Sequence, residues 1–347
     1  MRCLTLAELL RRHGVQAVFV CRPMPGHLCE QLEKKGFRVL RLREAAAGPA
    51  SADPASWLGA SVAEDAAETA AALATLGMQP DWLVVDNYAL DAAWERALRP
   101  RVRHIMVIDD LANRVHECDL LLDQNYYQDL EHRYDGLVPA QCEKLLGPQY
   151  VLLRQEFLDA RPMAKPRSGK VGRLLVFLGG SDPENFTGRA LQAITQANAR
   201  DLQVDAVVGA SNVHHEEIRK ACLDLRNASF HRQVNNMAAL MLQADLAIGA
   251  GGSTTWERCL LGLPALTLVI AQNQLQTTRD LSAIGLAWYL GRAQELSAAD
   301  IAAALCNALA DPARLRDMSA RSIQFMAGAG TPALNSMLEK LFKVTHA

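Results

Sequence analysis

The sequence predicts an α/β fold made of two doubly wound, Rossmann-like domains, each with a parallel sheet between helices. Short apolar runs of strand length alternate with amphipathic helical patterns from end to end, and this alternation is typical of parallel βαβ units. With 347 residues, half of them apolar, the chain can bury two cores of ordinary size. A polar, basic stretch with prolines and glycine at residues 161–170 interrupts the alternation and is interpreted as a linker.

We therefore expect two domains with a cleft between them, which is a common place for a ligand. The expected parts are an N-terminal domain over residues 1–160, the linker over 161–170, a second domain over 171–330 and a C-terminal helix over 331–347. The alanine-rich stretch 45–55 is expected to be a loop.

The first half opens with a helical pattern and not with a strand. Residues Leu6–Arg12 are amphipathic, whereas a doubly wound domain normally begins with a strand whose turn into the first helix binds ligands. Either the fold starts with a helix or the first strand of this domain is missing from the chain; we expect the second. Further strands are expected at Ala17–Cys21, Arg38–Leu42, Trp82–Asp86, His104–Ile108 and Leu120–Leu122, and helices at Leu28–Lys35, Ser61–Gly77 and Ala89–Leu98.

The second half repeats the alternation of strands and helices. Strands are expected at Leu174–Leu178, Leu202–Val208, Ala228–Phe230, Leu246–Ile248 and Ala265–Ile270. Helices are expected at Asn185–Ala199, His215–Leu225 and Asn236–Gln243, and the end of the chain is expected to be helical without further strands.

Composition and charge exclude several classes of protein. The formal net charge of −2 lacks the basic excess of a binder of nucleic acid or anionic membranes, and no apolar run approaches the about 20 residues that span a bilayer. The N-terminus lacks the apolar core of a signal peptide. The eight cysteines form no CxxC pair and no metal-ligand pattern, and are interpreted as small buried hydrophobes. We expect a cytoplasmic monomer without a metal or another cofactor.

The most informative stretch runs from Ala244 to Gln274. An apolar strand ends in the glycine turn 249–252, and Ser253 and Thr254 then open a capped, amphipathic helix. A helix N-terminus carries unpaired N–H groups and suits a phosphate, whereas Glu257, one turn further, can accept hydrogen bonds from a ribose diol. The alternative is an ordinary βα turn with a surface glutamate.

Other candidates also follow predicted strands, and the carboxyl ends of parallel strands line the ligand crevice in open α/β sheets. Gly179 and Gly180 form a second glycine turn, after which Asp182 or Ser181 either binds a ligand or only caps the next helix. Tyr88 either contacts a sugar or only packs as a cap on the hydrophobic core. Asn273 and Gln274 either bind a phosphate or an attacking water, or form a polar loop.

The remaining acids and histidines receive structural interpretations. Asp109 and Asp110 follow a strand but lack companions at metal-ligand spacing, so we interpret them as a solvated or capping pair. Each histidine considered stands alone or beside solvent-type residues and is expected to be structural or at the surface.

Several segments resemble, in order along the chain, the UDP-2,4-diacetamido-2,4,6-trideoxy-β-L-altropyranose hydrolase family of the pseudaminic-acid pathway. They read MRCLTLA, VVDNYALD, IDDLANR, CDLLLDQN, GPQYVLLRQEF, FLGGSDPEN, GAGGSTTWE and IAQNQ, and extend from Met1 to about Gln276. That family is similar in fold to the two-domain GT-B glycosyltransferases, including the peptidoglycan N-acetylglucosaminyltransferase, so the resemblance implies two GT-B-like domains.

The resemblance also implies an activity. A water molecule would cleave a UDP-linked diacetamido-trideoxy-hexose at its anomeric carbon, with inversion and without a metal, and release UDP and the free sugar for nonulosonic acid synthesis. The C-terminal half would hold UDP. The predicted catalytic residues are Tyr88 and Asn273. The predicted substrate-binding residues are Gly179, Gly180, Ser181, Asn185, Gly252, Ser253, Thr254, Glu257 and Gln274.

One departure from the family bears on mechanism. The family's general base is a histidine in a GxGH loop directly before the segment that MRCLTLA resembles, and no residue of this sequence matches it. Water needs a base within hydrogen-bond reach to be a competent nucleophile. His27, in Pro25-Gly26-His27, follows the second strand of the family pattern and is not its equivalent. Either the natural protein starts upstream or this chain lacks the base. There are two alternative functions: a glycosyltransferase that uses a UDP-sugar donor, and a non-catalytic nucleotide-sugar binder.

Overall fold

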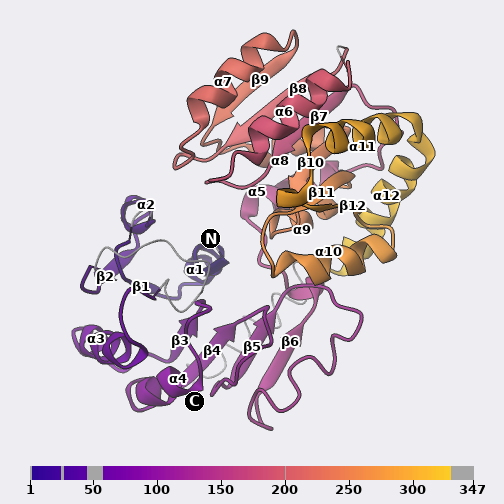
Figure 1. The fold of residues 1–347 in the computed structure, drawn as a ribbon. Coiled ribbons are helices and arrows are strands. Elements are labelled where there is room, and N and C mark those ends of the chain that lie inside the picture. Colours follow the sequence, from indigo (N-terminus) through magenta and orange to yellow (C-terminus); the bar gives the residue numbers. More distant parts are fainter. Residues whose placement is uncertain (1, 25–26, 45–57, 200, 330–347) are drawn as a thin grey trace. The chain divides into compact units, whose positions relative to one another are not determined.

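The structure, a computed structural model, describes residues 2–24, 27–44, 58–199 and 201–329 (Figure 1). The described chain divides into two compact units, which are treated separately. Unit 1 holds the described residues up to Asn125 together with 129–152, and unit 2 holds 126–128 and 153–329. The loop expected at 45–55 and the helix expected at 331–347 lie outside the described residues.

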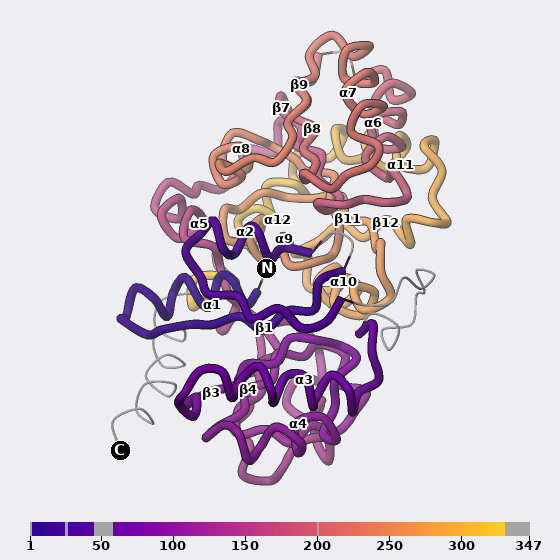
Figure 2. Tube along the Cα trace, turned by 90° about the vertical axis from the view of Figure 1, so that its left-hand side faces the viewer, coloured from indigo at the N-terminus to yellow at the C-terminus, as the bar shows by residue number. Residues whose placement is uncertain are grey.

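Unit 1 contains two separate parallel sheets. One pairs β1 (Val18–Cys21) with β2 (Arg38–Arg41), and the other has the order β3 (Trp82–Val85), β4 (His104–Ile108), β5 (Leu120–Asp123) and β6 (Glu143–Leu146). The helices are α1 (Arg2–Arg12), α2 (Cys29–Lys34), α3 (Val62–Ala74) and α4 (Ala92–Leu98), with short 3₁₀ turns η2 (Arg99–Arg101) and η3 (Pro148–Tyr150). Helices α3 and α4 lie side by side (Figures 1 and 2).

Helix α1 packs against both sheets of unit 1. Its Leu4 and Ala7 join a core with residues of β1 and β2, whereas its Leu6 packs with Met106 and Leu122 of the larger sheet. Helix α3 contributes to a third core that β1 and β3 also reach. The two sheets are therefore held by shared helices, and β1 and β3 are edge strands. The described chain opens in α1, and the expectation of a missing first strand stays a prediction.

Unit 2 contains one parallel sheet of six strands in the order β12-β11-β10-β7-β8-β9. The chain builds outward from β7 to β9, then returns to the other side of β7 and builds outward again to β12. The order thus reverses between β7 and β10, and such a switch point is where open α/β sheets bind ligands. The strands are β7 (Arg173–Phe177), β8 (Gln203–Val208), β9 (Ala228–Arg232), β10 (Leu246–Ala250), β11 (Ala265–Val269) and β12 (Trp288–Arg292).

The helices of unit 2 complete its core. Helices α6 and α11 pack on one face of the sheet, where Leu191 and Leu305 join Val176 and Ile248 in the main apolar cluster. None of the described helices combines the length and the hydropathy that a membrane span requires. The helices are α5 (Gln155–Ala160), α6 (Phe186–Gln196), α7 (His215–Asp224), α8 (Met237–Gln243), α9 (Thr254–Leu260), α10 (Gln274–Ala283), α11 (Ala298–Ala310) and α12 (Pro312–Phe325), with 3₁₀ turns η4 (Arg161–Met163), η5 (Ala293–Glu295) and η6 (Met326–Gly328).

The stretch 161–170, interpreted as a linker, is packed within unit 2. The Arg167 guanidinium donates hydrogen bonds of 2.9 Å to the carbonyl oxygens of Ala244 and Met241. Its backbone N–H donates to the Ser319 hydroxyl at 2.8 Å. The chain passes from one compact unit to the other ahead of this stretch, between Leu152 and Leu153.

The ten strands expected from the sequence are present with shifts of a few residues at their ends, and two further strands were not predicted. Strand β6 begins with Glu143 and Lys144 and shows no clear apolar run. Strand β12 begins inside the apolar run 286–290, which was not predicted to be a strand. Helices α5, α10 and α11 were also not predicted. Helix α10 is polar on much of its surface and starts inside the stretch read as a loop.

We expect the backbone amides of β1 and β2 to exchange with solvent faster than those of β4 and β5. All four residues of β1 are half-buried in a two-stranded sheet, whereas β4 and β5 are paired on both sides and mostly buried. Local opening needs less free energy where a sheet is small and little apolar surface is covered. Native-state hydrogen exchange measured on peptides tests this, and equal protection of the two sheets would contradict it.

Candidate functional site

Three turns of unit 2 follow neighbouring strands. The turns after β7, β10 and β11 hold Gly179–Ser181, Gly251–Ser253 and Ala271–Asn273, respectively. Since β11, β10 and β7 are adjacent and parallel, these turns lie at the same edge of the sheet, on both sides of the switch point. The structure therefore brings together the unit 2 residues that the sequence singled out.

Two glycines, one at the end of β10 and one in the turn after it, approach neighbouring side chains closely. A Cβ on Gly251 would lie 2.2 Å from Thr278 Oγ1 of α10, and one on Gly249 would lie 2.5 Å from Arg258 Nη1 of α9. Gln274 reinforces the packing, because its Oε1 accepts a hydrogen bond of 3.1 Å from the Ile270 N–H. The glycine spacing read from the sequence thus reflects close packing as well as turn geometry.

Ser253 does not cap α9 in the way that the sequence predicted. Its backbone already has helical angles, φ −56° and ψ −29°, and its side chain makes no capping hydrogen bond. A capping residue normally has extended angles that aim its oxygen back at the first amides. The Ser253 side chain is instead exposed beside the turn, where its hydroxyl can reach a ligand.

Arg258 stabilises the turn after β10 through hydrogen bonds. The side chain is buried, and its Nη2 donates hydrogen bonds of 3.0 Å to the Ala250 carbonyl and to Thr255 Oγ1. Burial lowers the pKa of Arg258 to about 10, which leaves the group charged near neutral pH. Since no ion pair of Arg258 is found in the described part of the chain, its positive charge remains under the turn.

Glu257 is not the surface glutamate of the alternative interpretation, because only 8% of the residue is exposed. Arg154 binds its carboxylate with two hydrogen bonds, from Nε to Oε1 at 2.8 Å and from Nη2 to Oε2 at 3.1 Å. Burial raises the pKa of Glu257, and Arg154 opposes that shift. Sequence reasoning missed Arg154, because nothing in the local pattern reveals a partner about a hundred positions away.

The turn after β7 is fixed by backbone contacts. Gly179 has a left-handed φ of +104°, and the Gly180 carbonyl accepts a hydrogen bond of 2.9 Å from the Gly209 N–H. Asp182 is buried and caps α6, since its carboxylate accepts from the N–H groups of Phe186 and Thr187 at 2.9 and 2.8 Å. Of the two interpretations of Asp182, ligand binding or helix capping, the structure therefore shows helix capping.

The asparagines of the two outer turns differ in their contacts. Asn185 caps α6, because its Oδ1 accepts a hydrogen bond of 3.0 Å from the Gly188 N–H, and its Nδ2 donates to Glu217. Asn273 precedes α10 and makes no capping hydrogen bond to it. The exposed Ser181 completes the turn after β7.

In unit 1, Tyr88 belongs to a polar cluster at the carboxyl ends of β3, β4 and β5. Its hydroxyl donates to Asp110 Oδ1 at 2.6 Å, and Arg2 bridges Asp86 and Asp110 at 2.6 and 3.1 Å. Burial, followed by the neighbouring Asp110, raises the pKa of Tyr88 above its ordinary value. Of the two interpretations of Asp109 and Asp110, the solvated pair is wrong, because both are buried. Asp109 does accept a local hydrogen bond of 2.9 Å from the Ala112 N–H, as a capping residue does.

Asp123 lies deepest in this cluster. It is fully buried, and it accepts hydrogen bonds from the Tyr134 hydroxyl at 2.9 Å and from Arg133 Nε at 3.1 Å. Burial nevertheless raises the pKa of Asp123 to about 7. The carboxyl group therefore titrates near neutral pH, which the sequence could not show because the effect depends on burial.

The histidines and cysteines take structural positions in most cases. His116 is buried and pairs with Glu95 at 2.7 Å, and the exposed His27 accepts a hydrogen bond from the Cys29 N–H. The expectation that all cysteines are buried is wrong for Cys306, which is exposed, and Cys3 and Cys21 are only partly buried. Within the described ranges, no three or more His, Cys, Asp or Glu residues are grouped so that they could hold a metal ion.

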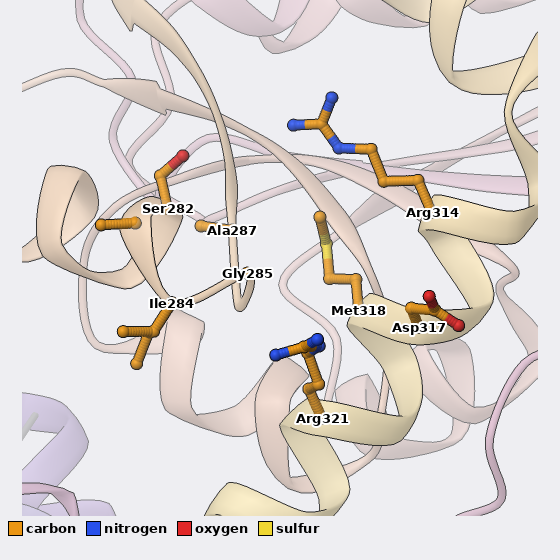
Figure 3. A pocket seen from close by; sticks show the side chains of 9 residues that line it. Ser282, Ile284, Gly285, Ala287, Arg314, Asp317, Met318 and Arg321 are labelled. Atoms are coloured by element: carbon orange, nitrogen blue, oxygen red, sulfur yellow. The ribbon is translucent and has the colours of Figure 1, made fainter.

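A surface pocket of about 490 Å³ lies at the end of the unit 2 sheet where the parallel strands begin (Figure 3). It is lined by residues 282–287, which connect α10 to the amino end of β12, and by Arg314, Asp317 and Arg321 of α12. Because the strands are parallel, this end is opposite the glycine turns. The pocket is therefore separate from the candidate site.

Comparison with known proteins relates this arrangement to sugar-nucleotide enzymes. Residues 174–331 match the glycosyltransferase family 28 C-terminal domain. The uncharacterized protein MJ1062 of Methanocaldococcus jannaschii is 22% identical, over 79% of this chain and 53% of that protein. The UDP-2,4-diacetamido-2,4,6-trideoxy-β-L-altropyranose hydrolase of Campylobacter jejuni is 26% identical, over 58% of this chain and 71% of that protein. The chain thus spans about half the length of MJ1062.

Solved structures confirm the predicted fold class. MurG of Acinetobacter baumannii has a TM-score of 0.62 at 14% identity, with 99% of this chain and 95% of that chain covered. Os79 of O. sativa in complex with UDP has a TM-score of 0.66 at 14% identity, with 99% and 96% covered. The chain has the GT-B glycosyltransferase fold, with parallel sheets in two α/β domains.

Gly251→Ala should destabilise unit 2 by about 1–3 kcal/mol, because overpacking at this level forces shifts in neighbouring groups. The obstructing atom, Thr278 Oγ1, finds no hydrogen-bond partner among the described residues, so Thr278→Ala should restore part of the loss in the double variant. Denaturation of all four chains gives the coupling free energy. Gly328→Ala, whose Cβ meets nothing within 4 Å, is the control, and additive effects would contradict the prediction.

The pKa of Asp123 predicts how unit 1 responds to pH. Because the folded-state pKa of about 7 exceeds the ordinary value of 3.8, the folded form binds more protons than the unfolded form between about pH 4 and 7. The contribution of Asp123 to the free energy of unfolding should fall by on the order of 3 kcal/mol as pH rises through this window.

Asp123→Asn should remove that slope, and hydrogen exchange of the β4 and β5 amides at several pH values would measure it. Asp135→Asn is the control, because Asp135 is exposed and the pKa of its carboxyl group is lowered, not raised, by His132 and Lys144. The same pH dependence in the wild type and in Asp123→Asn would show that Asp123 is already ionised at low pH.

Proposed function

We propose that unit 2 binds the UDP group of a UDP-sugar and that the chain catalyses hydrolysis of that sugar nucleotide at its anomeric carbon. The observation that carries the proposal is the buried Glu257 carboxylate beside the glycine turn of β10, at the switch point of the sheet. This site lies within the region that matches the glycosyltransferase family 28 C-terminal domain. The solved structure of Os79 with UDP shows that a protein of this fold binds that nucleotide.

The chemistry of the turns suits a pyrophosphate and a ribose. Gly180 and Gly252 can present backbone N–H groups without side-chain obstruction, and Ser253 and Thr254 add hydroxyl donors. The buried Arg258 places a positive charge beneath the same turn. A carboxylate in this position repels phosphate but accepts hydrogen bonds from neutral hydroxyl groups, so we assign Glu257 to the ribose.

Hydrolysis is favoured over other reactions by relatives whose names state it. Proteins of Campylobacter jejuni and Helicobacter pylori that are similar to this chain carry the altropyranose hydrolase name. In the proposed reaction the water oxygen bonds to the anomeric carbon, the bond from that carbon to the phosphate oxygen breaks, and its electron pair leaves with UDP. The water proton passes to a base, and no residue of this sequence matches the histidine of the resembled family.

The remaining predicted residues are assigned to the sugar and to the reacting water. Tyr88 and Asn273 are the proposed catalytic contacts, and Asn185, Gln274, Gly179 and Ser181 complete the substrate-binding set. A diacetamido-trideoxy-hexose is the proposed sugar, since the hydrolase-named relatives specify it. The free sugar would then be available for nonulosonic acid synthesis.

A glycosyltransferase is the second candidate, and the family 28 match together with the GT-B fold favours it. Such an enzyme would bind the same donor through the same unit 2 site. It would differ in passing the sugar to an acceptor hydroxyl instead of water. The two functions therefore share the nucleotide site and differ in what releases UDP.

The experiment is incubation of the chain with a UDP-linked diacetamido-trideoxy-hexose. We expect UDP and free sugar in equal amounts without any acceptor, with the inverted anomer first in the proton NMR spectrum. The reaction should persist in excess EDTA, because the resemblance implies hydrolysis without a metal. Glu257→Gln should weaken UDP binding by about 1–3 kcal/mol, the range for hydrogen bonds to charged groups, whereas the surface change Glu216→Gln should not.

The outcomes separate the candidate functions. UDP release only after an acceptor is added would identify a transferase. Binding of the sugar nucleotide without release would identify a non-catalytic binder. Absence of UDP binding would overturn the assignment of unit 2 as the nucleotide domain.

A further inference from the structure

Arg154 occupies an unusual position, between two carboxylates of unit 2. It directly precedes α5, and its guanidinium donates two hydrogen bonds to Glu257 and one, from Nη1 at 2.7 Å, to Glu156 Oε1. Its charged end also lies 4.7 Å from the centre of the Phe157 ring. Glu156 is itself anchored, because its second oxygen accepts a hydrogen bond of 3.1 Å from the Ala238 N–H at the start of α8.

In this arrangement, Arg154 occupies only half of the hydrogen-bond acceptor positions of the Glu257 carboxylate. Each carboxylate oxygen has about two acceptor positions, and Arg154 takes one on each oxygen at 2.8 and 3.1 Å. One acceptor position therefore remains on each oxygen. These remaining positions point away from each other on the two oxygens, and each can accept a hydrogen bond from a hydroxyl group such as those of a ribose.

We propose that Arg154 is a positioning residue for the nucleotide, which orients the Glu257 carboxylate so that it accepts hydrogen bonds from the ribose hydroxyls. The inference rests on the proposed function, because it assigns Glu257 to a nucleotide. It adds a residue that makes no contact with the nucleotide and acts through Glu257. A bidentate guanidinium suits this task because its planar fork fixes the plane of the carboxylate.

The charges around Glu257 explain why a partner is needed. Burial raises the pKa of Glu257, as does the nearby Glu156, whereas Arg154 and the neighbouring Arg258 lower it. Strand β10 and turn η6, which pack against α9, carry no ionisable side chains. Helix α12 also packs there, but its Arg314, Asp317 and Arg321 line the separate pocket (Figure 3), and its Arg316 pairs with Asp317. Arg154 is therefore the group that opposes the rise in the pKa of Glu257 by direct hydrogen bonds.

The test compares UDP with 2′,3′-dideoxy-UDP, which lacks both ribose hydroxyls, by calorimetry at pH 6 and pH 8.5. The chains are wild type, Arg154→Met, Glu257→Gln and the double variant. Arg219→Met, on the exposed face of α7, is the matched control. Thermal unfolding by circular dichroism verifies that each variant is folded.

We expect Arg154→Met to weaken UDP binding about 10-fold at pH 6, in the range for hydrogen bonds to a charged group, and less at pH 8.5. The loss is greater at low pH because removal of Arg154 leaves the rise that burial causes in the pKa of Glu257 less opposed. Titration of the UDP phosphates affects every chain alike and cancels in the ratio to wild type. Arg154→Met and wild type should bind dideoxy-UDP with equal affinity. When Glu257→Gln is already present, adding Arg154→Met should not weaken UDP binding further.

A readout without ligand tests the inference independently of UDP. The carboxyl ¹³C signal of Glu257 should titrate at higher pH in Arg154→Met than in wild type. Unchanged titration, or tighter UDP binding by Arg154→Met, would overturn the positioning role, and the second result would identify Arg154 as a competitor of the ribose. An equal loss for UDP and dideoxy-UDP would assign Arg154 to structure alone. Failure of wild type to bind UDP would overturn the proposed function and the ribose assignment, whatever the titration shows.

Discussion

The close contact of the β10–α9 turn with α10 and with Arg258 is the constraint on which the rest of the candidate site depends. Side chains on Gly249 or Gly251 would occupy the space of Arg258 and Thr278. Since these contacts fix the turn, they also fix the start of α9 and therefore the position of Glu257.

Buried charges are the second organising feature, and each is compensated in a different way. Glu257 is held by Arg154, whereas Arg258 relies on carbonyl and hydroxyl oxygens. In unit 1, Asp110 and Asp123 are surrounded by hydroxyl and guanidinium donors, although burial still raises the pKa of Asp123 to about 7. Burying a charge requires such partners. These buried charged side chains lie near the carboxyl ends of strands, where α/β folds bind their ligands.

The fold and the function rest on different grounds. The GT-B fold follows from the two parallel α/β units and from solved structures that match almost the whole chain. A fold of this kind hosts both hydrolases and transferases, so the choice between them depends on the site. Both proposed functions use the same proposed nucleotide site, the glycine turns with Glu257 and Arg154. What distinguishes the reactions is the group that receives the sugar.

The α/β class, ten of the strands and the glycine turns follow from local patterns in the amino-acid sequence, namely alternating apolar residues and glycine positions. Strand β6, which begins with two charged residues, and strand β12, which begins in the apolar run 286–290, were missed, and the packing of 161–170 against unit 2 was not foreseen. The folded structure was needed to show that Asp110 is buried, that Asp182 caps α6 and that Glu257 is bound by Arg154. Burial, pKa and ion pairing depend on groups that lie far apart along the chain and that the fold brings together.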